Sequence, residues 1–278
     1  MNIIVFTLAL GVGSIVAGFL GALTGLGGGV VIVPLLVLLF GVDIHYAIGA
    51  SLVSVIATSS GAAAAYVREG YSNVRAGMFL EIATTVGALS GAMIATRVPT
   101  SGLAIVFGCV LLYSAYLSRH HTDRSTEDVP PDRWATALRL DSTYPTAAGR
   151  RAYRVQHVPT GFGLMYLAGV LSGLLGIGSG AVKVLAMDQA MRLPFKVSTT
   201  TSNFMIGVTA AASAGVYLHR GYIDPGLAMP VVLGVLFGSM QGARVLDRAH
   251  PDRLRLVFTW VIVALGLQML FNGVTGRL

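Results

Sequence analysis

The sequence predicts an all-α polytopic membrane protein with two inverted-topology repeats, each a glycine-broken helical hairpin plus three transmembrane helices. Hydrophobic residues make up 54% of the chain and charged residues 11%, whereas soluble domains carry about 25% charged residues. The mean hydropathy is +0.74, and several apolar runs approach the roughly 20 residues that cross a bilayer as a helix. An ungapped internal repeat at an offset of 151 residues predicts that one half duplicates the other.

Polar loops separate eight apolar segments. At about 1.5 Å per residue, roughly 20 residues cross a hydrocarbon core of about 30 Å, so six segments are predicted to be single spans. The other two are longer, and each carries a cluster of glycines. The first segment has no positively charged start and has an internal counterpart, so we expect a mature segment rather than a signal peptide. The segments are 3–40, 47–67, 76–96, 101–118, 158–187, 198–219, 227–243 and 255–273.

The two glycine clusters are predicted to break helices. Residues 23–34 read LTGLGGGVVIVP, and residues 174–185 read LLGIGSGAVKVL. Glycine loses more conformational freedom in a helix than any other residue, so such a cluster interrupts helical structure. Broken helices are tolerated at membrane depth only where they line a cavity or are buried in protein. We therefore predict that both breaks meet near the bilayer centre and form a binding site.

One register aligns the two halves over about 90 residues. Apolar residues often match by chance, but glycine and tyrosine positions in a single register do not, and this agreement indicates a duplication. The matching pairs include Gly18 with Gly169, Thr58 with Thr209, Tyr71 with Tyr222, Gly87 with Gly238, and Gly91 with Gly242.

The chain divides into a first transmembrane repeat (1–118), an arginine-rich linker (119–157) and a second transmembrane repeat (158–278). The linker is expected to be solvent-exposed, with one short amphipathic helix near residues 134–140, and its seven arginines favour the cytoplasm. If each long segment enters and leaves on one side, the cytoplasmic loops hold 15 Lys and Arg and the outer loops three. Each half then crosses an odd number of times, which inverts the halves and places both termini outside.

The net charge of +7 does not indicate nucleic-acid binding, because the arginines fall in loops between apolar runs. The single cysteine, Cys109, excludes an intramolecular disulfide and a cysteine-rich metal site. Asp43 and the three histidines at 45, 120 and 121 lack the spacing of a metal site. We expect no metal and no cofactor.

A new half-helix is predicted to begin near Val30 and another near Ala181. The first N–H groups of a helix have no intrahelical acceptor and lie at its positive dipole end. Two such ends that converge can bind an anion without a charged side chain. Lys183 lies at the start of the second half-helix, and an intramembrane lysine is a functional candidate. The alternative is a lysine that snorkels to the membrane surface.

Hydroxyl and amide side chains follow the second glycine cluster at residues 198–203. They can donate hydrogen bonds to an oxyanion, or they can hold helices together. We expect substrate contact for Thr200 to Asn203 and helix packing for Thr58 to Ser60. The predicted substrate-binding residues are Gly27, Gly28, Gly29, Ser51, Gly178, Ser179, Gly180, Lys183, Thr200, Thr201, Ser202 and Asn203.

Glu81 is the one carboxylate well inside a single span, and it is a candidate to carry a proton in a coupled cycle. The alternative is that it caps polar groups near the membrane surface. Asp188 and His219 are expected to lie at the interface.

These motifs resemble the sulfite exporter TauE/SafE family, also called the toluene sulfonate uptake permease family. The resemblance lies in GLGGG at 25–29 with Pro34, in GIGSG at 176–180 with Lys183, in TSN at 201–203, and in the duplicated spans. It implies transport of a sulfur-containing anion, such as sulfite, thiosulfate or an organosulfonate, across the bacterial inner membrane. Ser179 and Leu185 replace the glycine and proline expected of the family, and the linker is long.

Other functions stay open at this point. A carrier for another small anion such as a carboxylate would have a similar sequence pattern, and a structural or sensor protein is also conceivable. We expect no enzyme, because the spans contain no paired aspartates, no histidine-rich metal motif and no nucleophile–base pair. Membrane lipids and a small anion are the expected partners, and a homo-oligomer is left open.

Overall fold

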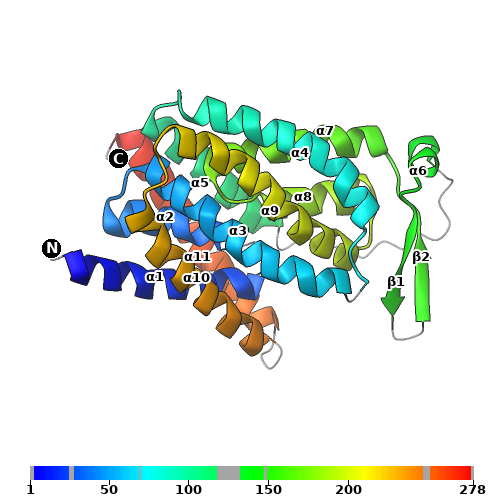
Figure 1. The fold of residues 1–278 in the computed structure, drawn as a ribbon, viewed down its shortest axis with the longest axis horizontal. Helices are drawn as coiled ribbons and strands as arrows, with labels where there is room; N and C mark the ends of the chain where they lie inside the picture. Colours follow the sequence, from blue (N-terminus) through cyan, green and yellow to red (C-terminus); the bar gives the residue numbers. More distant parts are fainter. Residues whose placement is uncertain are drawn as a thin grey trace.

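A computed structural model describes residues 3–24, 28–68, 70–117, 132–146, 149–246 and 251–276. This part of the chain is almost entirely helical, with one two-stranded hairpin (Figure 1). The elements are α1 (Ile3–Thr24), α2 (Gly29–Phe40), α3 (Ile44–Arg68), α4 (Val74–Ala95), α5 (Thr100–Leu117), α6 (Arg133–Ala137), β1 (Ser142–Thr146), β2 (Gly149–Tyr153), α7 (Val158–Leu175), α8 (Gly180–Leu185), the π-helix η1 (Ala186–Ala190), α9 (Phe195–His219), α10 (Pro225–Leu246) and α11 (Pro251–Thr275).

The helices agree with the apolar segments of the sequence. Each of the two long segments is divided at its glycine cluster, and each single span forms one helix. Among the described residues, three helices are long and apolar enough to cross a membrane, namely Val74–Ala95, Val158–Leu175 and the Pro225–Gly242 part of α10. Shorter apolar helices are Val5–Gly21, Gly29–Phe40, Ile44–Ser60, Thr100–Tyr116 and Trp260–Thr275. The prediction of a helical membrane protein is confirmed at this level.

The first helix of each half packs against a helix of the other half. A Cβ atom added at Gly238 in α10 would lie 2.0 Å from the carbonyl oxygen of Ile15 in α1. A Cβ atom added at Gly87 in α4 would lie 2.2 Å from the carbonyl oxygen of Tyr166 in α7. Gly87 and Gly238 are 151 residues apart, and so are their partners Ile15 and Tyr166. The same close contact is therefore made twice, each time between the halves.

A second pair of close contacts is also repeated at the offset of 151 residues. A Cβ atom at Gly18 in α1 would lie 2.5 Å from the carbonyl oxygen of Val235 in α10. A Cβ atom at Gly169 in α7 would lie 2.1 Å from the carbonyl oxygen of Thr84 in α4. Small residues let helices approach closely inside a bilayer, where packing rather than water drives association. The repeated glycines thus hold α1 on α10 and α7 on α4.

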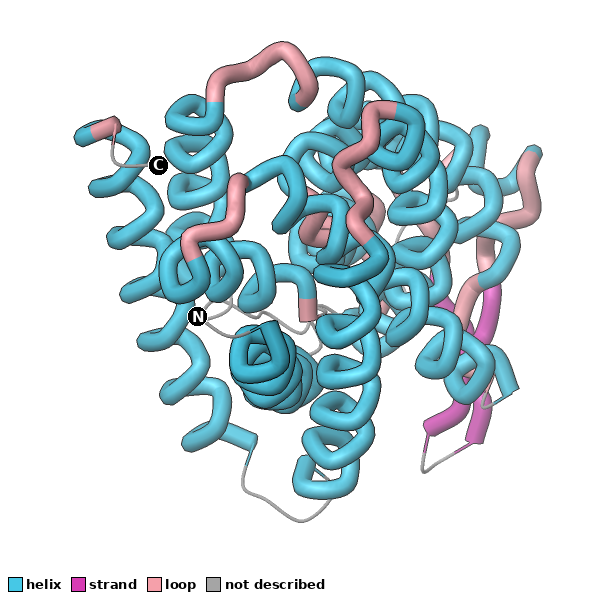
Figure 2. The backbone as a smooth tube through the Cα atoms, turned by 60° about the vertical axis from the view of Figure 1, so that its left-hand side comes forward, coloured by secondary structure: helices cyan, strands magenta, loops and turns pink. Residues whose placement is uncertain are grey.

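The first helices of the two halves, α1 and α7, differ in direction in Figure 1. In Figure 1, α1 begins and α11 ends at the left-hand end, whereas β1 and β2 lie at the right-hand end. Helix α7 begins beside the hairpin, so it runs against the direction of α1. Figure 2 shows the strands on one side of the tightly packed helices.

The linker is more structured than the sequence predicts. The short helix expected near residues 134–140 is α6, and Asp132 starts it by accepting hydrogen bonds from the N–H groups of Trp134 and Ala135. Desolvation raises the pKa of Asp132, but hydrogen bonds from the backbone outweigh it and lower the pKa overall. Strands β1 and β2 form an antiparallel pair that was not predicted. Residues 118–131 lie outside the described part of the chain.

Asn73 attaches the linker to the helices. Its Nδ2 donates to the carbonyl oxygen of Leu140 at 2.8 Å and to the hydroxyl of Tyr153 at 2.9 Å. Its Oδ1 accepts from the N–H of Ala76 and so caps α4, while its own N–H donates to Thr201 Oγ1 at 2.9 Å. Burial raises the pKa of Tyr153 to about 12, so this phenol stays neutral and keeps its contact. One residue therefore joins the linker, α4 and α9.

Candidate anion site at the helix breaks

The two glycine breaks lie against each other. The first separates α1 from α2, which begins at Gly29, and the second separates α7 from α8, which begins at Gly180. A Cβ atom added at Gly29 would lie 3.0 Å from the carbonyl oxygen of Gly176. Gly28 precedes α2 directly and is buried, whereas Gly27 lies outside the described residues. The breaks therefore meet, although they come from opposite halves of the chain.

The backbone of the second break is left-handed at three positions. Gly176 has a φ of 68° and Gly178 a φ of 70°, values that glycine adopts without strain. Ser179, where glycine is usual in the family that the motifs resemble, has a φ of 41°. Its hydroxyl donates to the carbonyl oxygen of Ala168 at 2.6 Å, which anchors the turn to α7. The break is thus a defined turn that ends α7 and starts α8.

Helix α3 packs against both breaks. Ser51 Oγ donates to the carbonyl oxygen of Gly176 at 2.8 Å, and it would lie 2.7 Å from a Cβ atom at Gly29. Val55, one turn further along, would lie 3.0 Å from the same Cβ atom and 3.3 Å from one at Gly178. A Cβ atom at Gly29 would therefore clash with Ser51, and one at Gly178 would press on Val55.

Helix α9 has the matching role in the second half. Ser202, the repeat counterpart of Ser51, donates to the carbonyl oxygen of Gly180 at 3.3 Å. Ile206, the counterpart of Val55, would lie 2.9 Å from a Cβ atom at Gly178. Ser51 and Ser202 thus lie against the counterpart glycines Gly29 and Gly180, whereas Val55 and Ile206 both lie against Gly178.

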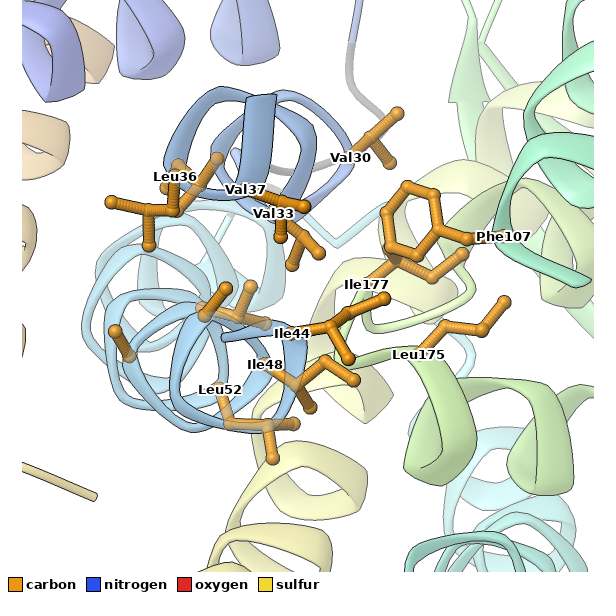
Figure 3. Close-up of a cluster of buried hydrophobic side chains, with 14 of the residues drawn as sticks. Val30, Val33, Leu36, Val37, Ile44, Ile48, Leu52, Phe107, Leu175 and Ile177 are labelled. Carbon is orange, nitrogen blue, oxygen red and sulfur yellow. The ribbon is translucent and has the colours of Figure 1, made fainter. Parts of the chain in front are cut away.

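Apolar side chains surround the breaks. Figure 3 shows Leu175 and Ile177, at the second break, facing Val30 and Val33 of α2 and Ile48 of α3. Each of these side chains is at most 6% exposed. Water is excluded from such a cluster, so a charge placed there interacts strongly with its neighbours.

Lys183 lies three residues after Gly180 and is buried inside the protein. Its side chain is 0% exposed, and Nζ donates to Thr209 Oγ1 of α9 at 2.5 Å. A snorkelling lysine would reach the surface, so that alternative does not describe Lys183.

Thr209 in turn donates to a carboxylate from the other half. Its Oγ1 lies 2.7 Å from Glu81 Oε1 in α4, and Thr85 Oγ1 donates to the same oxygen at 3.2 Å. Glu81 is only 8% exposed and lies in α4, which packs on α9. Its other oxygen, Oε2, is buried and has no hydrogen-bond partner in the structure. A chain of lysine, hydroxyl and carboxylate thus connects the two halves.

The hydroxyls of Thr200 and Thr201 point elsewhere. Thr200 Oγ1 donates to carbonyl oxygens within its own helix, at Lys196 and Val197. Thr201 faces α4, where its hydroxyl accepts the N–H of Asn73. Asn203 is half-buried on α9. Substrate contact by these three residues stays a prediction.

Sequence reasoning did not select Thr209 for the site. Its match with Thr58 identifies it as part of the repeat, but this match alone suggests helix packing. A stronger signal is its spacing of seven residues from Ser202, two helical turns away, which places both on one face of α9. The described residues contain no group of three metal-ligating side chains.

Comparison with known proteins decides the family. Residues 10–269 match the model of the family described as "Sulfite exporter TauE/SafE". The chain belongs to the TauE/SafE family. The resemblance stated from the glycine motifs is therefore confirmed over nearly the whole chain.

Several curated relatives of this TauE/SafE protein are named as transporters. The "Probable membrane transporter protein YunE" of Bacillus subtilis (strain 168) is 27% identical, with 94% of this chain and 96% of YunE covered. The "Probable membrane transporter protein MJ0441" of Methanocaldococcus jannaschii is also 27% identical, with 92% of each chain covered. A "Probable membrane transporter protein" of Xylella fastidiosa (strain 9a5c) is 26% identical, with 98% of each covered. No solved structure matches significantly.

The family and these relatives identify the TauE/SafE protein as a membrane transporter embedded in the bilayer by apolar helices. They point to transport rather than to catalysis.

Proposed function

We propose that this protein is a secondary transporter that moves a small sulfur-containing anion across the bacterial inner membrane. The anion would be sulfite, thiosulfate or an organosulfonate, held midway through the membrane between the two broken helices. One observation carries the proposal: Lys183 is fully buried in the half-helix that follows the second break. The second break lies against Gly29 of the first break.

The chemistry of this place suits an anion. The first N–H groups of α2 have no intrahelical acceptor and lie at its positive dipole end. Helix α8 continues directly into η1, so residues 180–190 form one helical segment that also begins at a break. The ammonium group of Lys183 adds a full positive charge inside an apolar protein. In such surroundings an oxyanion gains more from these donors than it would in water.

The proposed binding residues are those predicted from the sequence. Ser51 and Ser202 hold the glycines of the two breaks, and Lys183 supplies the charge. Thr200, Thr201 and Asn203, which the sequence also predicts, complete the proposed set. The glycines are Gly27, Gly28 and Gly29 in the first half and Gly178 and Gly180, with Ser179, in the second.

We further propose an inverted pair of repeats, residues 1–118 and 158–278, with the linker 119–157 in the cytoplasm. The reciprocal glycine contacts between α1 and α10 and between α7 and α4 support a two-fold relation of the halves. The opposite directions of α1 and α7 in Figure 1 support the inversion. Both chain ends lie opposite the arginine-bearing hairpin, which supports termini on the outer side.

A binding screen tests the substrate class. Purified protein in detergent is heated with thiosulfate, sulfite or methanesulfonate and, separately, with acetate or succinate at equal ionic strength. A ligand that binds only the folded state stabilises it by about 2.7 kcal/mol at 100 times its Kd, so we expect the sulfur anions to raise Tm and the carboxylates to leave it unchanged. A rise with carboxylates alone would replace the proposed substrate with an organic acid. No rise with any anion would contradict an anion site.

A further inference from the structure

We propose that Glu81 is the proton site of the transport cycle, and that it takes up one proton when an anion binds at Lys183. The protein would then be a proton–anion symporter whose direction depends on the two gradients. This inference rests on the proposed anion site and adds the coupling ion.

The hydroxyl of Thr209 bridges the two charged side chains. Lys183 Nζ donates to Thr209 Oγ1 at 2.5 Å, and Thr209 Oγ1 donates to Glu81 Oε1 at 2.7 Å. This order of donors fits an ammonium at one end and a carboxylate at the other. Without an anion, the two opposite charges therefore neutralise each other inside the protein.

An anion at Lys183 changes this balance. The negative charge of the anion competes with Glu81 for the ammonium group of Lys183. The carboxylate of Glu81 then has no compensating charge, although it is only 8% exposed. A buried carboxylate without a partner is so unfavourable that it takes up a proton instead. The step forms one O–H bond from a solvent proton and breaks none, so charge and atoms balance.

Glu81 has an oxygen available for this proton. Thr209 and Thr85 both donate to Oε1, whereas Oε2 is buried and has no hydrogen-bond partner in the structure. A proton can therefore add to Oε2 while both contacts to Oε1 remain.

Among the described residues near Lys183 and Glu81, no other side chain is placed to take up the proton. The charged or titratable residues of the elements packed around α4 and α8 lie at helix ends, on the surface or in other contacts. Tyr217 is buried, but its hydroxyl donates to the carbonyl oxygen of Gly173, and Tyr153 contacts Asn73. The full set of charged or titratable residues considered around the pair is Arg75 in α4, Tyr153 in β2, Tyr166 in α7, Asp188 in η1, and Lys196, Tyr217 and His219 in α9.

Calorimetry in buffers with different ionisation enthalpies counts the protons directly. Thiosulfate is the probe because it stays fully ionised near neutral pH, so every proton counted belongs to the protein. We expect the wild type to take up about one proton for each thiosulfate bound. In Glu81→Gln we expect thiosulfate to bind with an uptake near zero, because the neutral amide imitates the protonated acid.

Asp224→Asn is the matched control, because Asp224 is an exposed acid at the start of α10 and asparagine retains its capping oxygen. This variant should still take up about one proton. A second measurement needs no variant: because binding takes up one proton, the affinity of the wild type should fall about tenfold for each unit by which the pH rises, over the range in which that uptake is measured.

The outcomes separate the two proposals. Thiosulfate binding without proton uptake and without pH dependence would overturn the coupling and leave the anion site standing. Undiminished proton uptake in Glu81→Gln would overturn the assignment to Glu81. The absence of thiosulfate binding to the wild type would overturn the anion site itself.

Discussion

Replacing Lys183 with methionine is expected to weaken thiosulfate binding by about 30-fold to 1,000-fold. Truncating one partner of a buried charge pair costs roughly 2 to 4 kcal/mol, and about 1.4 kcal/mol corresponds to a factor of ten. Methionine is unbranched and flexible, so it can occupy the volume of the lysine stem without the charge. Titration calorimetry of the purified variant measures the change.

Lys196→Met is the control for this variant. Lys196 is also a lysine close to the same helices, but it is exposed and its Nζ lies 3.8 Å from the centre of the Tyr71 ring. We expect its affinity for thiosulfate to equal that of the wild type. Equal affinity in Lys183→Met would mean that the buried charge does not contact the anion.

Alanine at Gly87 or at Gly238 is expected to lower the stability of the protein by about 3 kcal/mol or more. The added Cβ atoms would lie 2.2 Å and 2.0 Å from backbone oxygens of the facing helices, so the backbones must separate. Overpacking alone typically costs about 1 to 3 kcal/mol, and a rigid backbone is harder to displace than a side chain. For a chain of this size we expect Tm to fall by roughly 6 to 12 °C.

The counterpart contacts give this prediction an internal check. Because Gly87 and Gly238 make the same contact in opposite halves, the two alanine variants should lose similar stability. Gly215 in α9 has nothing within 4 Å of an added Cβ atom, so Gly215→Ala should raise stability by up to about 1 kcal/mol through helix propensity. Thermal unfolding in detergent measures all three. If the three variants have equal Tm values, the close approach of the paired helices is wrong.

The broken helices could be predicted from the sequence because glycine acts locally. The half-helices predicted near Val30 and Ala181 begin at Gly29 and Gly180. No long-range information is needed for this, since a run of glycines destabilises a helix in any surroundings. The membrane spans could also be predicted from the sequence, because the bilayer sets their length and apolarity.

The connection from Lys183 through Thr209 to Glu81 could not be predicted. It depends on the packing of α4 against α7 and α9 of the other half, and this packing is a property of the tertiary structure alone. Both charged residues are unusual in apolar segments, but nothing in the sequence places them at the two ends of one hydroxyl bridge.

The hairpin in the linker was missed for a different reason. Its strands read STYPT and GRRAY, and they lack the alternation of apolar and polar residues that indicates a half-buried strand. Only Tyr153 among these residues is fully buried, and its partner Asn73 lies far away in the sequence.

Uptake of radiolabelled thiosulfate into proteoliposomes tests the central claim most directly, because it asks whether the paired helix breaks and Lys183 form a transport path. We predict saturable uptake that unlabelled sulfite and methanesulfonate inhibit, and that falls to the level of protein-free liposomes when Lys183→Met is reconstituted. Wild-type liposomes that take up no more thiosulfate than protein-free ones would contradict the account.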